Sequence, residues 1–136
     1  MDQKISKILF EGPRMPPQNV DAEISLLGSL LLENDAINSV VDTLREDDFY
    51  KQEHKVIYSA ILSLFNLQKP VDVLSVANIL KERGKFAEMG GHAYLTNLVN
   101  SVPTSSNALY YAEIVRKKKI LRDLISVSHG ISQLGY

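Results

Sequence analysis

The last quarter of the chain contains no strong helix breaker, and this feature constrains the fold most. Pro103 is followed by the polar residues 104–107, which favour the start of a helix, and Gly130 only weakens a helix that could continue to Gly135. The segment predicts one helix of about 28 residues, which is roughly 42 Å long. The compact part of so small a domain cannot cover such a length, so we expect the distal half of the helix to project.

The projecting half of this helix carries an apolar stripe that the rest of the chain is not expected to cover. Its members recur at helical spacing: Leu121, Leu124, Ile125, Ile131 and Leu134. Contiguous apolar surface that stays exposed usually marks an interface. The sequence therefore predicts that this stripe binds a partner.

The residues before the long helix show helical periodicity almost throughout. Apolar residues recur at intervals of three and four in the segments 20–32, 36–44, 52–65, 73–81 and 94–99. The first segment is apolar on more than one face, which makes it the expected centre of the core, with Asn19 or Asp21 as its N-cap. Gly28 within it could let a neighbouring helix approach closely. The fold class is therefore all-α: a compact helical head at residues 18–102, followed by one long projecting helix at residues 103–136.

Two segments fall outside these predicted helices. Residues 1–17 contain three prolines and a short apolar patch, lack the apolar core of a signal peptide, and are expected to form an extended or disordered arm. Residues 47–50 (DDFY) are predicted to form a capped turn that places both aromatic rings on the core.

Composition excludes several classes of protein. The chain has 136 residues and no cysteine, which suits one soluble domain and excludes disulfide frameworks, cysteine-ligated zinc, thiol nucleophiles and iron–sulfur clusters. The longest apolar run, residues 26–32, is far too short to span a bilayer. The net charge of −1 provides no broad electrostatic footprint for nucleic acid. A cytoplasmic location is the default expectation.

Catalytic and metal sites find little support in the sequence. His54, His92 and His129 lie in different predicted elements without metal-ligand spacing. The acidic residues 46–48 precede a turn and are interpreted as caps and solvated charge rather than as an acid–base pair. The Gly84-Lys85 pair lacks the glycine that a phosphate-binding loop needs. We therefore expect no catalytic, cofactor-binding or metal-binding residues.

A basic run near the start of the long helix leaves a nucleic-acid contact open as an alternative. It comprises Arg116, Lys117, Lys118, Lys119 and Arg122. On a helix these side chains spread over more than half of the circumference, so we interpret them as solvated faces beside the apolar stripe. The predicted helices between residues 52 and 83 could also form a helix-turn-helix, although the second offers few outward polar groups for reading bases. A small helical DNA-binding regulator is therefore the alternative hypothesis.

Five stretches of the chain carry a resemblance to a known family. They are residues 16–23 (PPQNVDAE), 48–50 (DFY), 70–72 (PVD), 90–95 (GGHAYL) and 102–116 (VPTSSNALYYAEIVR). In this order and spacing they closely resemble the N-terminal domain of the bacterial replicative DNA helicase, the DnaB family. Each stretch is short, but all five are in register over most of the chain from residue 16 onward.

The resemblance implies an all-helical head followed by a helical hairpin, in which paired hairpins help to build an N-terminal collar on a hexameric ring. The long helix would be the first arm of the hairpin, and the chain would end before the second arm. In the family, ATP hydrolysis with Mg²⁺ and DNA translocation belong to a RecA-like C-terminal domain that this sequence does not contain. The resemblance thus implies a binding module with no cofactor of its own, acting on DNA only indirectly.

The resemblance also implies partners and contact residues. The family collar receives the C-terminal domain of primase, and a helicase loader and self-association into dimers and hexamers are further expectations. Positions matching the primase contact are Asp21, Tyr94, Ile125 and Ile131. Taken by itself, Tyr94 would be interpreted as core packing with its hydroxyl at the rim. With the stripe, the predicted partner-binding residues are Asp21, Tyr94, Leu121, Leu124, Ile125 and Ile131.

Overall fold

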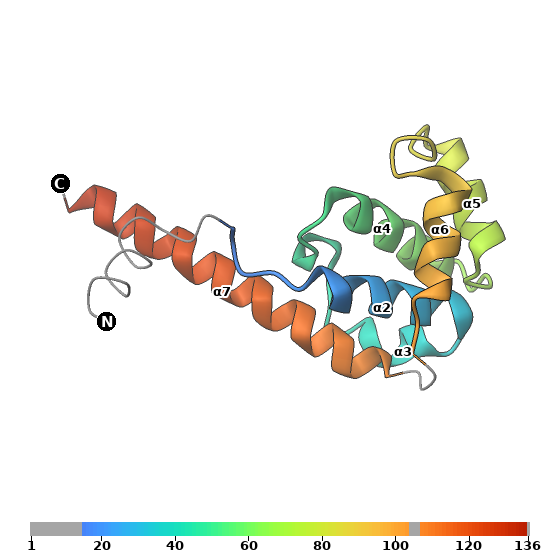
Figure 1. Cartoon of the computed structure of the whole chain (residues 1–136), viewed down its shortest axis with the longest axis horizontal. Coiled ribbons are helices and arrows are strands. Elements are labelled where there is room, and N and C mark those ends of the chain that lie inside the picture. Colours follow the sequence, from blue (N-terminus) through green and yellow to red (C-terminus); the bar gives the residue numbers. More distant parts are fainter. Residues whose placement is uncertain (1–14, 104–106, 136) are drawn as a thin grey trace.

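The computed structural model describes residues 15–103 and 107–135, and within these ranges it contains helices and no strand. The elements are α2 (Val20–Leu32), α3 (Ala36–Val40), the short 3-10 helix η1 (Glu46–Asp48), α4 (Gln52–Asn66), α5 (Val73–Glu82), α6 (Gly91–Asn100) and α7 (Ala108–Leu134). Elements α2 to α6 form a head, and the distal half of α7 projects from it (Figure 1). The all-α prediction is confirmed. Residues 1–14 of the arm expected at residues 1–17 lie outside the described residues, as do the predicted cap residues 104–106.

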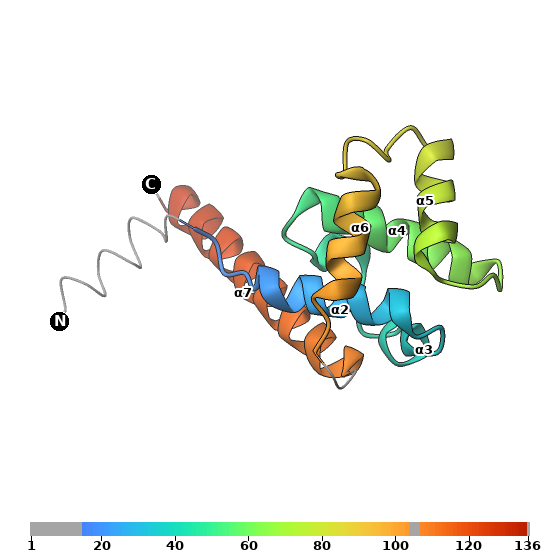
Figure 2. The same ribbon diagram turned by 45° about the vertical axis from the view of Figure 1, so that its right-hand side comes forward.

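Helix α2 is the centre of the core. It packs against α7, α6 and α4, and two views show α7 and α6 on different sides of it (Figures 1 and 2). Its buried apolar side chains are Ala22, Leu26, Leu27, Leu30 and Leu31. The predicted cap is Asn19, whose Oδ1 accepts a hydrogen bond from the backbone N–H of Ala22 at 2.9 Å.

Gly28 allows the close contact between α2 and α6. A Cβ atom at this position would overlap the Leu98 carbonyl oxygen and the Val102 side chain. A residue without Cβ is therefore required here, and the predicted close approach of a neighbouring helix is confirmed.

The second predicted helix is shorter than expected. Helix α3 ends at Val40, where residues 36–44 were predicted to be helical, and the backbone N–H groups of Thr43 and Leu44 both donate to the Val40 carbonyl, at 2.9 and 3.0 Å. The tighter turns keep Leu44 buried and aim its carbonyl at the buried Tyr58 hydroxyl, which donates to it at 2.9 Å. A tertiary hydrogen bond thus accounts for the departure from the helical pattern.

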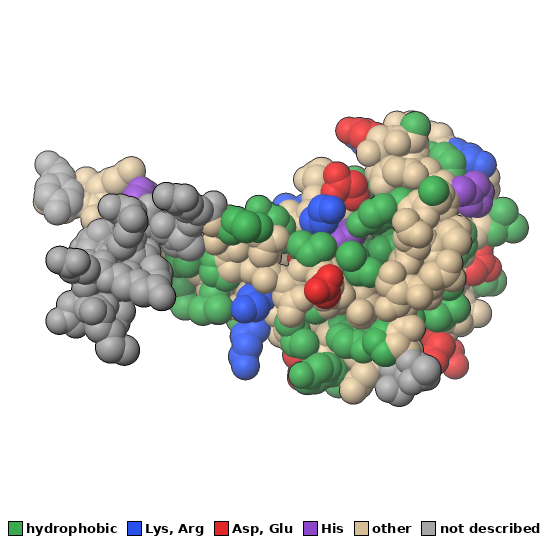
Figure 3. Space-filling model, viewed as in Figure 1, with side chains coloured by type: hydrophobic (Ala, Val, Ile, Leu, Met, Phe, Trp, Pro, Cys, Tyr) green, Lys and Arg blue, Asp and Glu red, His purple; other side chains and the backbone are tan. Residues whose placement is uncertain are grey.

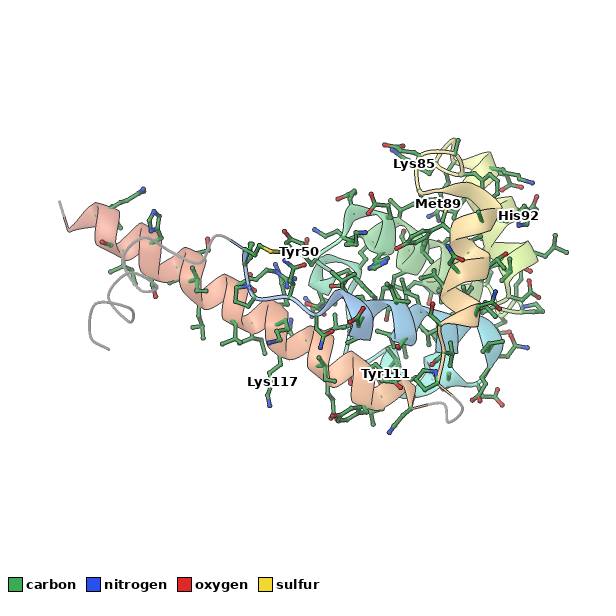
Figure 4. The ribbon with its side chains drawn as sticks, in the orientation of Figure 1. Tyr50, Lys85, Met89, His92, Tyr111 and Lys117 are labelled. Atoms are coloured by element: carbon green, nitrogen blue, oxygen red, sulfur yellow. The ribbon has the colours of Figure 1, made fainter. Side chains whose placement is uncertain are left out.

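In the turn before α4, the prediction that both aromatic rings lie on the core is confirmed for Phe49 and wrong for Tyr50. Phe49 is buried against Tyr58, with ring centroids 5.1 Å apart. Tyr50, expected on the core, is 37% exposed and lies where the head meets α7 (Figure 4). The Arg122 guanidinium is 5.6 Å from its ring centroid, so this ring supports a cation on α7 instead of the core.

Helix α7 is covered by the head along its first half only. Its 27 residues compare with about 28 expected from the sequence. The buried members are Ala108, Ala112 and Val115, whose small side chains let α2 and α3 approach closely. No described helix, α7 included, is both long enough and apolar enough to cross a membrane.

Candidate partner-docking surface

The projecting half of α7 carries an exposed row of five apolar side chains, which we call the distal apolar line. It consists of Ile120, Leu124, Val127, Ile131 and Leu134. The spacing of four, three, four and three residues places all five on one side of the helix. Exposure is 44% at Ile120 and 89% at Leu134, the two ends of the line. Figure 3 shows hydrophobic side chains on this part of α7.

Two further predicted residues form an adjoining strip. Leu121 and Ile125 are 42% and 41% exposed and lie about a third of a turn from the distal apolar line. At later helical positions this strip continues as Ser128 and Ser132. The apolar surface is therefore wide near the head and narrows to the distal apolar line toward the end of α7.

Sequence reasoning missed Ile120 and Val127. The predicted stripe combined members of the distal apolar line, Leu124, Ile131 and Leu134, with the adjoining strip. The missed signal was present in the spacing, because a regular alternation of four and three is typical of a helix that packs along one seam.

Cations of the basic run fasten α7 to the head. Arg116 Nη1 donates to Asp48 Oδ1 at 2.8 Å. Arg122 donates to two carbonyl oxygens, that of Pro17 at 2.9 Å and that of Asp48 at 2.8 Å. The interpretation of these arginines as solvated charge was therefore wrong. For Asp48 the predicted cap is confirmed, because its second oxygen accepts from the Arg45 N–H at 2.8 Å, but the prediction of solvated charge was wrong, because its side chain is 3% exposed.

Lys119 is also engaged within the chain. Its ammonium lies 3.0 Å from Asp123 Oδ1 and 3.2 Å from Asp47 Oδ2. These bonds raise the pKa of Lys119, with Asp123 the larger cause, and the hydrogen bond from Lys119, ahead of that from Lys55, lowers the pKa of Asp47. Lys117 projects away from the head (Figure 4). Three of the five basic side chains thus bind groups of the head or the segment before α2, so only two remain for a contact with nucleic acid.

The other two predicted residues lie on the head. Asp21 is exposed in the first turn of α2, and Tyr94 is half-buried on α6. Within the described residues no hydrogen bond or ion pair joins either of them to the distal half of α7. The structure therefore brings the α7 residues together in one surface and places Asp21 and Tyr94 outside it.

Tyr94 belongs to a buried polar network that the sequence did not reveal. Its hydroxyl lies 2.5 Å from His54 Nε2, and His54 Nδ1 lies 2.6 Å from Glu23 Oε1. The network joins α6 to α4 and α2 across 40 and 31 positions of sequence. Burial, assisted by Glu53 and Glu23, raises the pKa of Tyr94, so its hydroxyl keeps its proton at neutral pH.

Glu23 completes the network by capping another helix. Its Oε2 accepts from the Tyr50 N–H at 2.8 Å and its Oε1 from the Lys51 N–H at 3.4 Å. Lys51 is the N-cap of α4 and offers no side-chain bond of its own, so the carboxylate of α2 supplies the acceptor at this helix start. Within the described residues, no group of three or more His, Asp or Glu side chains is placed to hold a metal ion.

Comparison with known proteins gives consistent matches. The family model described as the DnaB-like helicase N terminal domain matches residues 15–117. Replicative DNA helicase DnaC of Bacillus subtilis is 44% identical over 90% of this chain, and Replicative DNA helicase DnaB of Mycobacterium leprae is 45% identical over 90%. The chain spans 27% and 20% of the length of these two relatives.

A solved structure agrees with these matches. The crystal structure of the N-terminal domain of DnaB helicase from Mycobacterium tuberculosis aligns with a TM-score of 0.86 at 44% identity. The alignment covers 90% of this chain and 85% of that one. The similarity thus extends through the head and along α7.

Proposed function

Since the chain belongs to the family of DnaB-like helicase N-terminal domains, we propose that it is an oligomerisation and partner-docking module of a replicative DNA helicase. It contributes to the N-terminal collar of the hexamer and binds primase during DNA replication in the cytoplasm. The distal apolar line is the observation that carries this proposal. ATP hydrolysis with Mg²⁺ and DNA unwinding belong to another part of the helicase, and a loader protein is a further partner.

The mechanism of assembly is burial of the distal apolar line between helices. Apolar surface removed from water contributes roughly 25 cal/mol per Å² before the entropy of association is subtracted. The spacing of the line suits the interdigitated packing of one helix along another. The head packs against only the first half of α7. The distal half therefore projects as a helical arm that another helix can pack against.

Primase docking uses a set of residues that shares Ile131 with the distal apolar line. Ile125 and Ile131 supply apolar contacts on α7, while Asp21 and Tyr94 supply polar groups on α2 and α6. Asp21 is exposed and Tyr94 half-buried, so both can be reached from solvent. This distribution suits a partner that contacts the head as well as the arm.

The test replaces apolar groups on α7 without disturbing the head. Ile125→Asn and Ile131→Asn are compared with wild type by light scattering and by titration with the purified C-terminal domain of primase. Leu74→Asn is the matched control, because Leu74 is 75% exposed on α5. We expect both α7 variants to stay folded and to lose hairpin pairing or primase binding, and the control to keep both. Unchanged association of the α7 variants would exclude this surface as an interface.

A further inference from the structure

A groove runs along the distal half of α7, on the side away from the distal apolar line. Its α7 residues Arg122, Ser126, His129 and Gln133 repeat at intervals of four, three and four, which places them on one face of the helix. Ile125, from the adjoining strip, forms one edge. The volume of the groove is about 570 Å³, and sites that bury a ligand measure roughly 300–1,000 Å³. The projecting arm therefore has two distinct faces.

The chain segment before α2 forms the other wall of the groove. Pro16 and Pro17 line it, and Arg122 Nη1 donates to the Pro17 carbonyl oxygen at 2.9 Å, which fastens this segment against α7. Two views show residues 15–19 beside α7, directed from the start of α2 toward the distal end of α7 (Figures 1 and 2). Traced backwards from α2, the chain thus enters the groove and points along it.

The groove contains space that the side chains of α7 leave open. A Cβ atom at Gly130 would meet no atom within 4 Å, and Ser126, one turn earlier, is also small. An apolar side chain placed beside these two residues would leave water without displacing any part of α7. Glycine is also a poor helix former, so this part of α7 gains most from being covered.

The residues that precede the two prolines have the composition and the length to fill the groove. Residues 8–10 (ILF) form the apolar patch of the N-terminal segment. Seven positions separate Phe10 from Pro17, and an extended chain of that length spans up to roughly 23 Å. The helix rises only about 17 Å between Arg122 and Gln133. The apolar patch can therefore reach the far end of the groove.

We propose that residues 8–14 continue along this groove as an N-terminal strap, with the apolar patch packed against Ile125 and in the space beside Gly130. The strap is joined to a wall of the groove, so its effective concentration there is on the order of millimolar, which favours it over a second copy of the chain. The chain thus covers one face of its own arm and leaves the distal apolar line as the face open to other chains. This cover does not depend on the proposed function.

The first experiment locates the strap. NMR of the 136-residue chain records NOEs from the Phe10 ring, and we expect them to the Ile125 methyl groups and the Gly130 Hα protons. The Ile131 methyl groups, which belong to the distal apolar line, are the matched control and should show none. A mixture of isotope-labelled and unlabelled chains separates contacts within one chain from contacts between chains. Absence of NOEs to the groove would overturn the strap, as would NOEs only between chains, which would place a second copy there.

The second experiment measures the cover. Hydrogen exchange of the amides at residues 126–134 reports local opening of α7, and in Ile8→Ser/Phe10→Ser we expect it to be about tenfold faster, with the α4 amides unchanged. Lys4→Ser/Lys7→Ser is the matched control and should exchange as wild type does. Cover by the strap is independent of protein concentration, unlike pairing with another copy. Unchanged exchange in the apolar variant, equal acceleration in the lysine variant, or acceleration seen only at high protein concentration would each contradict the strap.

Discussion

Arg116 on α7 and Asp48 at the end of η1 form an ion pair with an N–O distance of 2.8 Å, although 68 positions separate them in sequence. The carboxylate is buried, and its other oxygen accepts the Arg45 N–H. Arg122, six residues further along α7, donates to the Asp48 carbonyl at 2.8 Å. The direction in which α7 leaves the head is therefore fixed by these charged groups as well as by the buried alanines near the start of the helix.

Removal of this ion pair should loosen α7. Arg116→Met leaves the buried Asp48 carboxylate with one fewer donor, and we expect the free energy of unfolding to fall by about 1.5–3 kcal/mol. Urea denaturation followed by circular dichroism measures the change. Lys117→Met is the matched control, because Lys117 points away from the head (Figure 4) and should shift stability by less than about 0.5 kcal/mol. Equal stability of the two variants would mean that the pair contributes nothing to the attachment.

The contact at Gly28 makes a second prediction. In Gly28→Ala the added methyl group would overlap the Leu98 carbonyl, so α2 and α6 must move apart. We expect a loss of about 1–3 kcal/mol, the usual cost of overpacking a core. Gly130→Ala on the exposed part of α7 meets no atom within 4 Å and should stabilise its helix by about 1 kcal/mol. Thermal unfolding of the two variants should shift in opposite directions, and a shift in the same direction would contradict this account.

Features set by local chemistry could be predicted from the sequence. The absence of a breaker before Gly135 predicts the length of α7, and the predicted cap Asn19 accepts from the backbone N–H three residues on, at 2.9 Å. Each depends on residues within one helical turn of the feature. Periodicity likewise predicts burial of one face, because the core fills with whatever apolar side chains share that face.

The polar contacts that shape the candidate site could not be predicted in this way. From its position in the first turn of α2, Glu23 would be expected to be an exposed charge that favours the helix dipole. Instead it is buried and accepts a hydrogen bond from the backbone just before α4. Asp48 reads as a solvated acid before a turn, yet it receives Arg116. Both depend on pairings between distant segments, which a periodic pattern does not encode. Part of the distal apolar line could be predicted from the sequence, because a helix longer than the head must leave its distal side chains exposed.

Stability should decline at alkaline pH through Tyr58. Burial, assisted by Asp48, raises the pKa of Tyr58 far above its ordinary value near 10. The unfolded chain loses this proton above roughly pH 10 while the folded chain must keep it, so the free energy of unfolding falls as pH rises from there. Below that pH, Tyr58 is protonated in both states and contributes no slope.

Tyr58→Phe tests this assignment. It removes the hydrogen bond to the Leu44 carbonyl and should cost about 1–3 kcal/mol at pH 7, because a buried acceptor is left unpaired. Above roughly pH 10 the variant should lose stability less steeply than wild type. Tyr110→Phe, which alters a tyrosine 55% exposed on α7, is the control and should keep the wild-type slope. Urea unfolding from pH 8 to 11 provides both measurements, and parallel curves for wild type and Tyr58→Phe would rule out the assignment.

The distal apolar line predicts which face of α7 meets another copy. The chain has no cysteine, so one introduced thiol is its only thiol. Under mild oxidation, a cysteine at Leu124, Val127 or Ile131 should give disulfide-linked dimers on non-reducing gels. Parallel pairing places equal positions opposite one another and should link at all three, whereas antiparallel pairing should link only nearest the two-fold axis. His129→Cys, on the opposite face of the helix, is the control. Linking at position 129 with none at the other three would mean that α7 pairs through its other face, or that the line packs only against a different protein.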